Sequence, residues 1–143
     1  MDLDARATLD ADPDAVLSAL ADLSTYPHWL TIVASAIVEP DVDDAWSVEL
    51  AGRIGPFTRR KRVRMVRTEL DPAARAVRFE RREQDGRTHN EWVLAGTTTP
   101  AADLHIHLHY GGGRQLPGAD FLLRQEVRSA GTKLQAFLDA AKR

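Results

Sequence analysis

Three histidines alternate with apolar residues in the stretch LHIHLHYGGG, which covers residues 104–113. Successive side chains of a β-strand point to opposite faces, so we expect His105, His107 and His109 to share one face and the apolar residues the other. Neutral imidazoles at this spacing can converge on a zinc ion. The chain contains no cysteine, which excludes thiolate ligands, thiol nucleophiles and disulfides.

The surroundings of these histidines depend on how their strand pairs with its neighbour. A hairpin loop centred near Thr99 would gather four histidines and a glutamate on the outer face of the sheet. An outer face is open to water, and the sequence offers no second shell of hydrogen bonds to hold metal ligands. We therefore expect a solvated or dimer-contacting face without a metal, the alternative being zinc or a pH-sensitive contact. The expected cross-strand pairs are Glu91 with His107, His89 with His109, and Val93 with His105.

Basic residues are concentrated at 59–67, where the sequence is RRKRVRMVR. In a strand these charges divide between two faces, and Glu49 and Glu80 on neighbouring strands are the expected partners. The chain has 19 basic and 21 acidic residues and a net charge of −2, so we expect no nucleic-acid partner. Arg59 and Arg67 share the parity of the apolar residues of this segment. An arginine that points into an apolar cavity needs a partner or a ligand to offset its charge.

The elements that must position these side chains follow from periodicity. Residues 3–10 alternate as a half-buried strand, and Asp12-Pro13-Asp14 then begins a helix with a capping side chain and an early proline. A second short helix, capped by Ser24, is expected at 25–30, and apolar residues at three- and four-residue intervals over 123–141 predict a long amphipathic helix. Between the helices the pattern has period two, with turn residues at each break. The strands expected there are 32–39, 45–54, 57–69, 74–83, 88–95 and 103–110.

The composition is typical of one globular domain, here spanning 1–143, with 43% hydrophobic and 28% charged residues. The N-terminal segment MDLDARATLD is acidic and lacks the apolar core of a signal peptide. No apolar run is long enough to cross a bilayer. We therefore expect a cytoplasmic protein without a membrane span.

The element order, the segment DPDAVLSAL after the first strand, the segment LSTYPHWL and the final helix together resemble the START-like, helix-grip superfamily. Within it, the chain is similar to the bacterial SRPBCC group, often named polyketide cyclase/dehydrase and lipid transport proteins. The resemblance implies an α+β, helix-grip fold: a seven-stranded antiparallel sheet wrapped on a long C-terminal helix, with two short helices after the first strand. It also implies a deep hydrophobic cavity under the C-terminal helix. Because this fold hosts carriers, receptors and cyclases, it does not name the ligand.

The expected partner is therefore a hydrophobic or amphipathic small molecule, such as a lipid, isoprenoid or polyketide, and no cofactor is expected. In aromatase/cyclase members of the superfamily a pocket arginine and aromatic residues hold the poly-β-keto chain. An enzyme of that kind is the alternative function, with Arg59 or Arg67 as the candidate arginine and no catalytic residue assigned.

Several aromatic and apolar residues are expected to contact the ligand. Tyr26 and Trp29 are expected at the pocket rim, each with a polar atom for a ligand or a water. Gly131 lies inside the long helix, where a glycine is unfavourable unless packing requires it. Space for a ligand against the helix would be one such requirement. The expected ligand-binding residues are Tyr26, Trp29, Trp46, Phe57, Arg59, Met65, Phe79, Asn90, Trp92, Ile106, Leu108, Tyr110, Val127 and Gly131.

Overall fold

An antiparallel sheet and three helices make up the computed structural model, which describes residues 2–54, 57–111 and 119–142. Side chains are described for 2–51, 60–111 and 129–142. The elements in chain order are β1 (Asp2–Thr8), α1 (Pro13–Ala21), the short 3₁₀ helix η1 (Leu23–His28), β2 (Val33–Val38), β3 (Ala45–Ile54), β4 (Phe57–Asp71), β5 (Ala76–Arg81), β6 (Trp92–Thr98), β7 (Asp103–Tyr110) and α2 (Ala119–Ala141).

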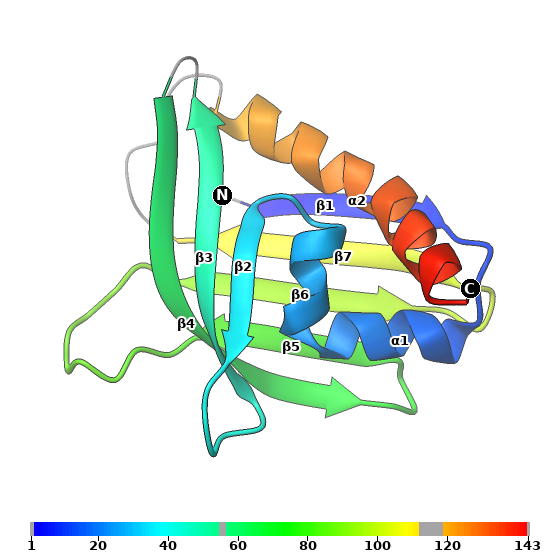
Figure 1. The fold of residues 1–143 in the computed structure, drawn as a ribbon, viewed down its shortest axis with the longest axis horizontal. Helices are drawn as coiled ribbons and strands as arrows, with labels where there is room; N and C mark the ends of the chain where they lie inside the picture. Colours follow the sequence, from blue (N-terminus) through cyan, green and yellow to red (C-terminus); the bar gives the residue numbers. More distant parts are fainter. Residues whose placement is uncertain (1, 55–56, 112–118, 143) are drawn as a thin grey trace.

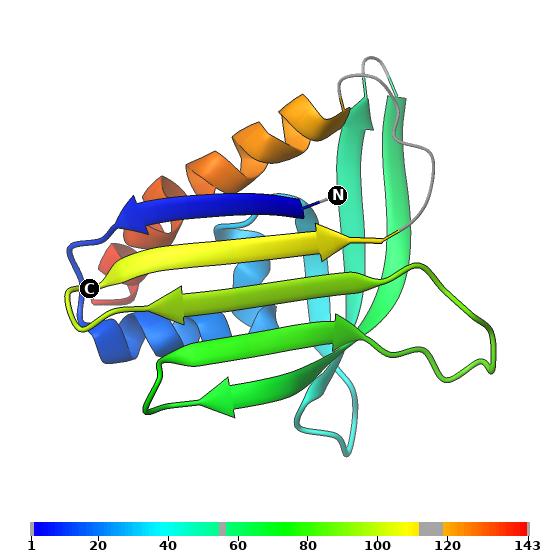
Figure 2. The same cartoon turned by 180° about the vertical axis from the view of Figure 1, so that it is seen from behind.

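The seven strands lie in the order β1-β7-β6-β5-β4-β3-β2, and every neighbouring pair is antiparallel. All three helices lie on one face of this sheet (Figure 1), while the opposite face carries no helix (Figure 2). This arrangement confirms the expected helix-grip architecture. Of the helices in the described ranges, none combines the length and the apolar composition needed to cross a membrane.

Capping side chains set where the first two helices begin. The Asp12 carboxylate accepts a hydrogen bond from the Asp14 backbone N–H at 2.9 Å, and Pro13 occupies the first helical position, as predicted. The Asp22 carboxylate accepts from the Ser24 N–H at 3.0 Å, so Asp22 rather than Ser24 is the cap and η1 begins at Leu23, two residues earlier than predicted. A second cap directly after Ala21 therefore ends α1 and turns the chain toward the core.

Alternating side chains divide the sheet into a buried and a wet face. Leu104, Ile106 and Leu108 of β7 are buried toward the helices, while the intervening histidines are half-buried on the opposite face. The described part of α2 buries Ala130, Leu134 and Leu138, which are four residues apart as one helix face requires. The core therefore lies between the sheet and the three helices.

Gly131 lies at the closest approach of α2 to β1. A Cβ atom built on Gly131 would lie 2.4 Å from the Cβ of Ala7. The hypothesis of ligand space against Gly131 is therefore wrong, because Ala7 fills that position. The glycine allows the helix and the edge strand to touch.

The β6–β7 hairpin differs from the sequence prediction. Strand β6 begins at Trp92, not at residue 88, and its turn is closed by backbone and side-chain hydrogen bonds of Thr99 to Ala101, Ala102 and Asp103. Ala102 adopts a left-handed φ of 62° in this turn. The turn is thus centred two residues later than predicted. The observed pairs are Val93 with His109, Ala95 with His107, and Thr97 with His105.

Candidate ligand-binding site

A small apolar cavity lies on the helix-facing side of the sheet, with a volume of about 20 Å³. This volume is close to the space that one water molecule needs. All but one of the lining side chains are aliphatic or methionine, and they come from η1, the segment that follows it and five strands. The lining residues are Leu23, Leu30, Ile32, Val33, Val48, Leu50, Met65, Trp92, Leu94 and Leu108.

Trp92 is the one aromatic residue of this lining, and it stands at the first position of β6. It pairs directly across the sheet with Tyr110 at the end of β7, and the two ring centroids are 4.5 Å apart at 40°. The Trp92 indole nitrogen is buried and has no hydrogen-bond partner among the residues that the structure describes. The Trp92–Tyr110 pair therefore packs the start of β6 against the end of β7.

The other predicted aromatic residues form a solid cluster next to the cavity. The ring of Phe79 meets those of Tyr26 and Trp46 edge-on, at centroid distances of 5.9 and 5.6 Å. Tyr26 and Trp29 are in turn 4.3 Å apart. The structure thus brings together four predicted residues from η1, β3 and β5, but as packed core. Ile106 is also buried, and of the predicted residues with described side chains only Met65, Trp92 and Leu108 line the cavity.

The prediction that Tyr26 and Trp29 stand at a rim is wrong, because their side chains are only 1% and 0% exposed. The Tyr26 hydroxyl donates to the Leu20 carbonyl at 2.7 Å, and the Trp29 indole N–H donates to the Thr25 hydroxyl at 3.2 Å. Burial raises the pKa of Tyr26 far above its usual value. Both polar atoms serve the protein itself, so neither is free for a ligand.

Arg67 finds its partner within the fold. Its guanidinium donates to the Ala21 carbonyl at the end of α1 at 2.7 Å and lies 5.7 Å from the centre of the Trp46 ring. Asn90 is exposed, because β6 begins after it, and its amide lies 3.5 Å from the Tyr110 hydroxyl. It does not point inward as predicted.

Three predicted site residues lie outside the side chains that the structure describes. They are Phe57, Arg59 and Val127.

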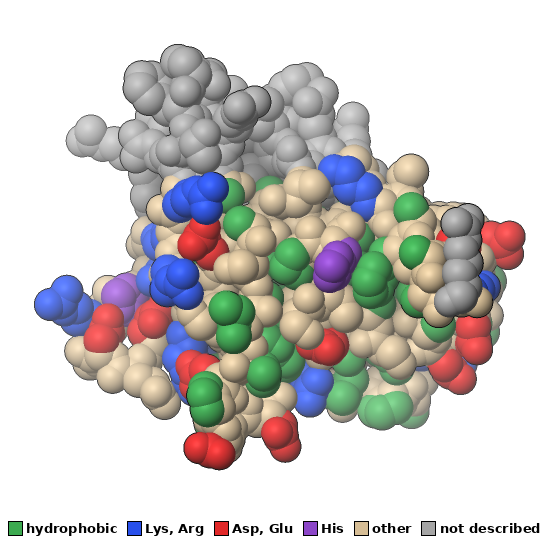
Figure 3. All heavy atoms as spheres, viewed as in Figure 1, with side chains coloured by type: hydrophobic (Ala, Val, Ile, Leu, Met, Phe, Trp, Pro, Cys, Tyr) green, Lys and Arg blue, Asp and Glu red, His purple; other side chains and the backbone are tan. Residues whose placement is uncertain are grey.

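The basic segment forms ion pairs across the sheet. Glu49 on β3 pairs with Arg60 and Arg62, as predicted, and Arg64 pairs with Glu39 at 2.6 Å. Glu80 instead pairs with arginines of its own strand and the loop that follows. On the helix-bearing face, side chains of both charge signs are interspersed (Figure 3).

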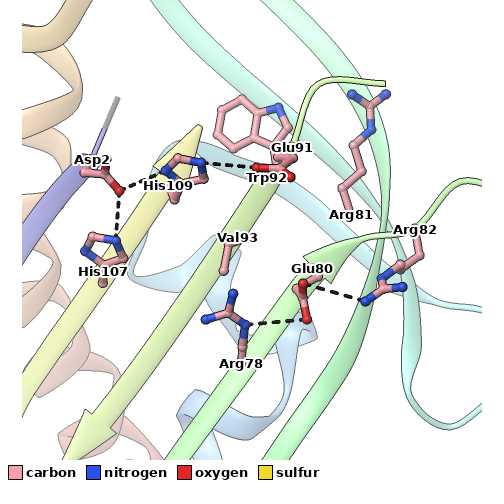
Figure 4. A pocket seen from close by; sticks show the side chains of 10 residues that line it. All are labelled: Asp2, Arg78, Glu80, Arg81, Arg82, Glu91, Trp92, Val93, His107 and His109. Carbon is pink, nitrogen blue, oxygen red and sulfur yellow. Dashed lines mark hydrogen bonds and ion pairs between the residues drawn. The ribbon is translucent and has the colours of Figure 1, made fainter. Parts of the chain in front are cut away.

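The outer face of the sheet holds an open groove of about 580 Å³ with a charged lining. Figure 4 shows that its carboxylates and bases are joined in chains, Asp2 with two histidines and Glu80 with two arginines. Trp92 belongs to both linings, so this residue separates the apolar cavity from the groove. The groove residues are Asp2, Arg78, Glu80, Arg81, Arg82, Glu91, Trp92, Val93, His107 and His109.

Strands β1 and β7 are joined on this face by a series of contacts that we call the histidine–aspartate ladder: Asp2, Asp4, His105, His107 and His109. One oxygen of Asp4 lies 2.8 Å from His105 Nε2 and 2.9 Å from His107 Nδ1. One oxygen of Asp2 lies 3.1 Å from His107 Nε2 and 2.9 Å from His109 Nδ1. His107 therefore has a carboxylate oxygen beside each ring nitrogen, and only a protonated ring can donate to both.

These contacts favour the ionised carboxylates. Hydrogen bonds from His107 first and His105 second lower the pKa of Asp4, and a hydrogen bond from His109 is the main cause that lowers the pKa of Asp2. Within the described chain, no three histidine or carboxylate side chains are arranged to hold a metal ion. The ladder therefore acts as a cross-strand tie between an edge strand and its neighbour.

The predicted four-histidine patch is wrong in one member. His89 turns back to Asp85 at 2.8 Å within the loop before β6, while Glu91 reaches His109 at 3.4 Å. Asp2 and Asp4 were not among the partners predicted for these histidines. Their alternation in the first strand was the available signal, and pairing of that strand with the last one would have completed it.

Solved structures with the same fold span almost the entire chain. A protein of Thermus thermophilus is 17% identical, with a TM-score of 0.73 and 100% of both chains covered. A START superfamily protein of Mycobacterium smegmatis is 12% identical, with a TM-score of 0.65 and 98% of both chains covered. The Zhui aromatase/cyclase of a Streptomyces species is 19% identical, with a TM-score of 0.51, covering 99% of this chain and 86% of that one. None of the curated proteins matches the chain.

These structural likenesses establish the fold, and the START-like, SRPBCC resemblance seen in the sequence is confirmed. The sequence match is broader than any single motif, because the family model covers residues 2–143, from β1 to the end of α2. The chain belongs to the polyketide cyclase/dehydrase and lipid transport family.

Proposed function

We propose that this protein binds and carries a hydrophobic or amphipathic small molecule, such as a lipid, isoprenoid or polyketide, between its sheet and its helices. The observation that carries the proposal is the apolar cavity, whose lining contains no charged side chain among the described residues. A lining of this kind, with few polar atoms, is typical of sites for small apolar ligands. The family assignment supports the same class of ligand.

The cavity is too small to hold a ligand without a change in its wall. A volume of about 20 Å³ holds no lipid, so the wall must open when a ligand binds. Met65 is the adaptable member of the lining, because its unbranched side chain has three rotatable bonds. Leu50 is only partly buried and gives the cavity a side that can move toward solvent.

A fluorescence titration with N-phenyl-naphthylamine, a neutral hydrophobic dye, tests this proposal. Val48→Leu adds a methylene to the cavity wall, whereas Val77→Leu makes the same change at an equally buried site outside the lining. Overpacking costs about 1–3 kcal/mol, so we expect Val48→Leu to weaken dye binding by about tenfold. Val77→Leu should leave dye affinity unchanged. Equal affinities in all three proteins, or no dye binding at all, would contradict the proposal.

Cyclase or dehydrase activity is the second candidate, favoured by the family description alone. Enolisation of a poly-β-keto chain needs a poised acid or base, and the Tyr26 hydroxyl is already bonded to the Leu20 carbonyl. Arg67 is likewise bonded to the Ala21 carbonyl. If the protein is such an enzyme, Arg59→Ala or Arg67→Ala should abolish turnover of a poly-β-keto thioester. If it is a carrier, the wild type should show no turnover.

A further inference from the structure

The histidine–aspartate ladder and Glu91 form an unbroken chain in which basic and acidic side chains alternate. The members in order are His105, Asp4, His107, Asp2, His109 and Glu91, and neighbouring members are 2.8, 2.9, 3.1, 2.9 and 3.4 Å apart. Glu91 directly precedes β6, so the chain extends from the edge strand β1 across β7 to the start of β6. Within the described residues, only His107 and His109 have carboxylate oxygens beside both ring nitrogens.

The number of hydrogen bonds in this chain depends on whether these two rings are protonated. A neutral imidazole has one N–H donor and one acceptor nitrogen, whereas an imidazolium has two donors. An ionised carboxylate can only accept. A neutral ring at His107 therefore directs a lone pair at one of its two carboxylates and loses that hydrogen bond. Protonation of His107 and His109 restores the complete chain and adds attraction between opposite charges.

The charges around the chain favour the protonated rings. Asp2, Asp4 and Glu91 supply three carboxylates, so two protonated histidines bring the chain close to neutrality. The charged groups that face it from the neighbouring elements are Arg6 on β1, Asp103 on β7, Arg78 and Glu80 on β5, and Arg82 after β5. Both of the arginines from β5 and its following loop are paired with Glu80, which reduces their repulsion of an imidazolium.

The chain acts on the least supported strand of the sheet. Strand β1 lies at the edge and pairs only with β7 among the described strands. Asp2 and Asp4 are two of the four side chains that β1 directs to the outer face. The same strand contributes Ala7, which meets Gly131 of α2 on the other face. A change in how firmly β1 is held therefore reaches the long helix that covers the core.

We infer that the histidine–aspartate ladder is a pH-dependent latch, which holds β1 on β7 while His107 and His109 are protonated and weakens as they lose their protons near neutral pH. Histidine side chains ordinarily titrate near about pH 6.5, so this contribution to stability is present below that pH and is lost as the pH rises. The lowered pKa values of Asp2 and Asp4 keep both carboxylates ionised in weakly acidic solution. The inference does not depend on the proposed ligand.

Hydrogen exchange of the β1 amides tests the latch, with the β3 amides as an internal reference and with correction for the intrinsic effect of pH. Solvent screens the contacts, because the side chains of Asp2 and Asp4 are 57% and 52% exposed, so we expect a modest change. The protection of β1 relative to β3 should fall by about fivefold between about pH 5.5 and about pH 8. His107→Gln keeps a donor and an acceptor but cannot titrate, so this fall should disappear.

His28→Gln is the matched control. His28 is an exposed histidine that stacks on Phe137 and has no carboxylate partner among the described residues, so its replacement should leave the fall unchanged. Asp2→Asn is a second variant, which removes the carboxylate between His107 and His109 and should reduce the fall as His107→Gln does. Equal pH dependence in wild type and both ladder variants would overturn the latch. If neither variant folds, the wild type decides, because relative protection of β1 that stays constant or rises with pH would overturn it as well.

Discussion

Replacing Gly131 by alanine tests how closely α2 is held against the sheet. The new Cβ would lie 2.4 Å from the Cβ of Ala7, whereas non-bonded carbon atoms rest about 3.5–4.0 Å apart. The helix and β1 would therefore have to separate by about 1.1 Å or more. Neither atom can rotate away, because each Cβ is fixed directly to its backbone.

The magnitude follows from two opposing effects. Overpacking of a buried contact costs about 1–3 kcal/mol. Alanine in place of glycine inside a helix gains back about 1 kcal/mol of intrinsic propensity. We expect the overpacking to dominate, so that Gly131→Ala lowers the free energy of unfolding by up to about 2 kcal/mol.

Urea unfolding followed by circular dichroism measures this change, and a double-mutant cycle gives its cause. In an Ala7→Gly background the clash is absent, so Gly131→Ala should become neutral or stabilising. Ala136→Gly, at an exposed position of α2, provides the propensity effect alone. If Gly131→Ala stabilises the wild-type chain, the close contact of α2 with β1 is refuted.

The remaining predictions concern the histidine–aspartate ladder, two hydrogen bonds and the effect of metals. Because folding lowers the pKa of Asp4, the stabilisation from this carboxylate is present above the usual value of 3.8 and is lost as the pH falls through the lower folded value. Asp4→Asn should therefore reduce the fall in unfolding free energy at acid pH, whereas Asp41→Asn in an exposed loop should not. An equal fall in wild type and Asp4→Asn would contradict this prediction. Tyr26→Phe removes a buried hydrogen bond and should lower the free energy of unfolding by about 1 kcal/mol without changing dye affinity; a changed dye affinity would return Tyr26 to the binding site. Glu39→Gln weakens a charged hydrogen bond to Arg64 and should lower the free energy of unfolding by about 1 kcal/mol in urea titrations at low salt and by less at high salt; an effect independent of salt would show that packing, not charge, is lost. Zinc and chelators should leave the thermal midpoint unchanged, because carboxylates already lie beside both ring nitrogens of His107 and beside His105 Nε2 and His109 Nδ1; a stoichiometric shift with zinc would overturn that reasoning.

Much of the fold could be predicted from local patterns in the sequence. Strands β3 and β7 match their predicted bounds, because strict alternation and flanking turn residues define them. The β6–β7 register could not be predicted in the same way. It depends on the left-handed backbone conformation of Ala102 in the turn. Alanine rarely adopts this conformation, so sequence propensity does not indicate it.

The candidate site was less accessible to sequence analysis. Parity correctly predicted that Met65 and Leu108 face inward, but not whether they line a cavity or fill a core. The partner of Arg67 is a carbonyl at the end of α1, forty-six residues away in sequence. Such a contact follows from tertiary packing, and no local pattern of either segment contains it.

The most direct test of the central claim is a native mass spectrum of the freshly purified protein, followed by a denaturing spectrum of the same sample. A bound hydrophobic molecule predicts an adduct that disappears on denaturation and can be extracted into organic solvent. A bare chain mass in the native spectrum, unchanged after incubation with decan-2-one and a lipid extract, would contradict a ligand-binding cavity between the sheet and the helices.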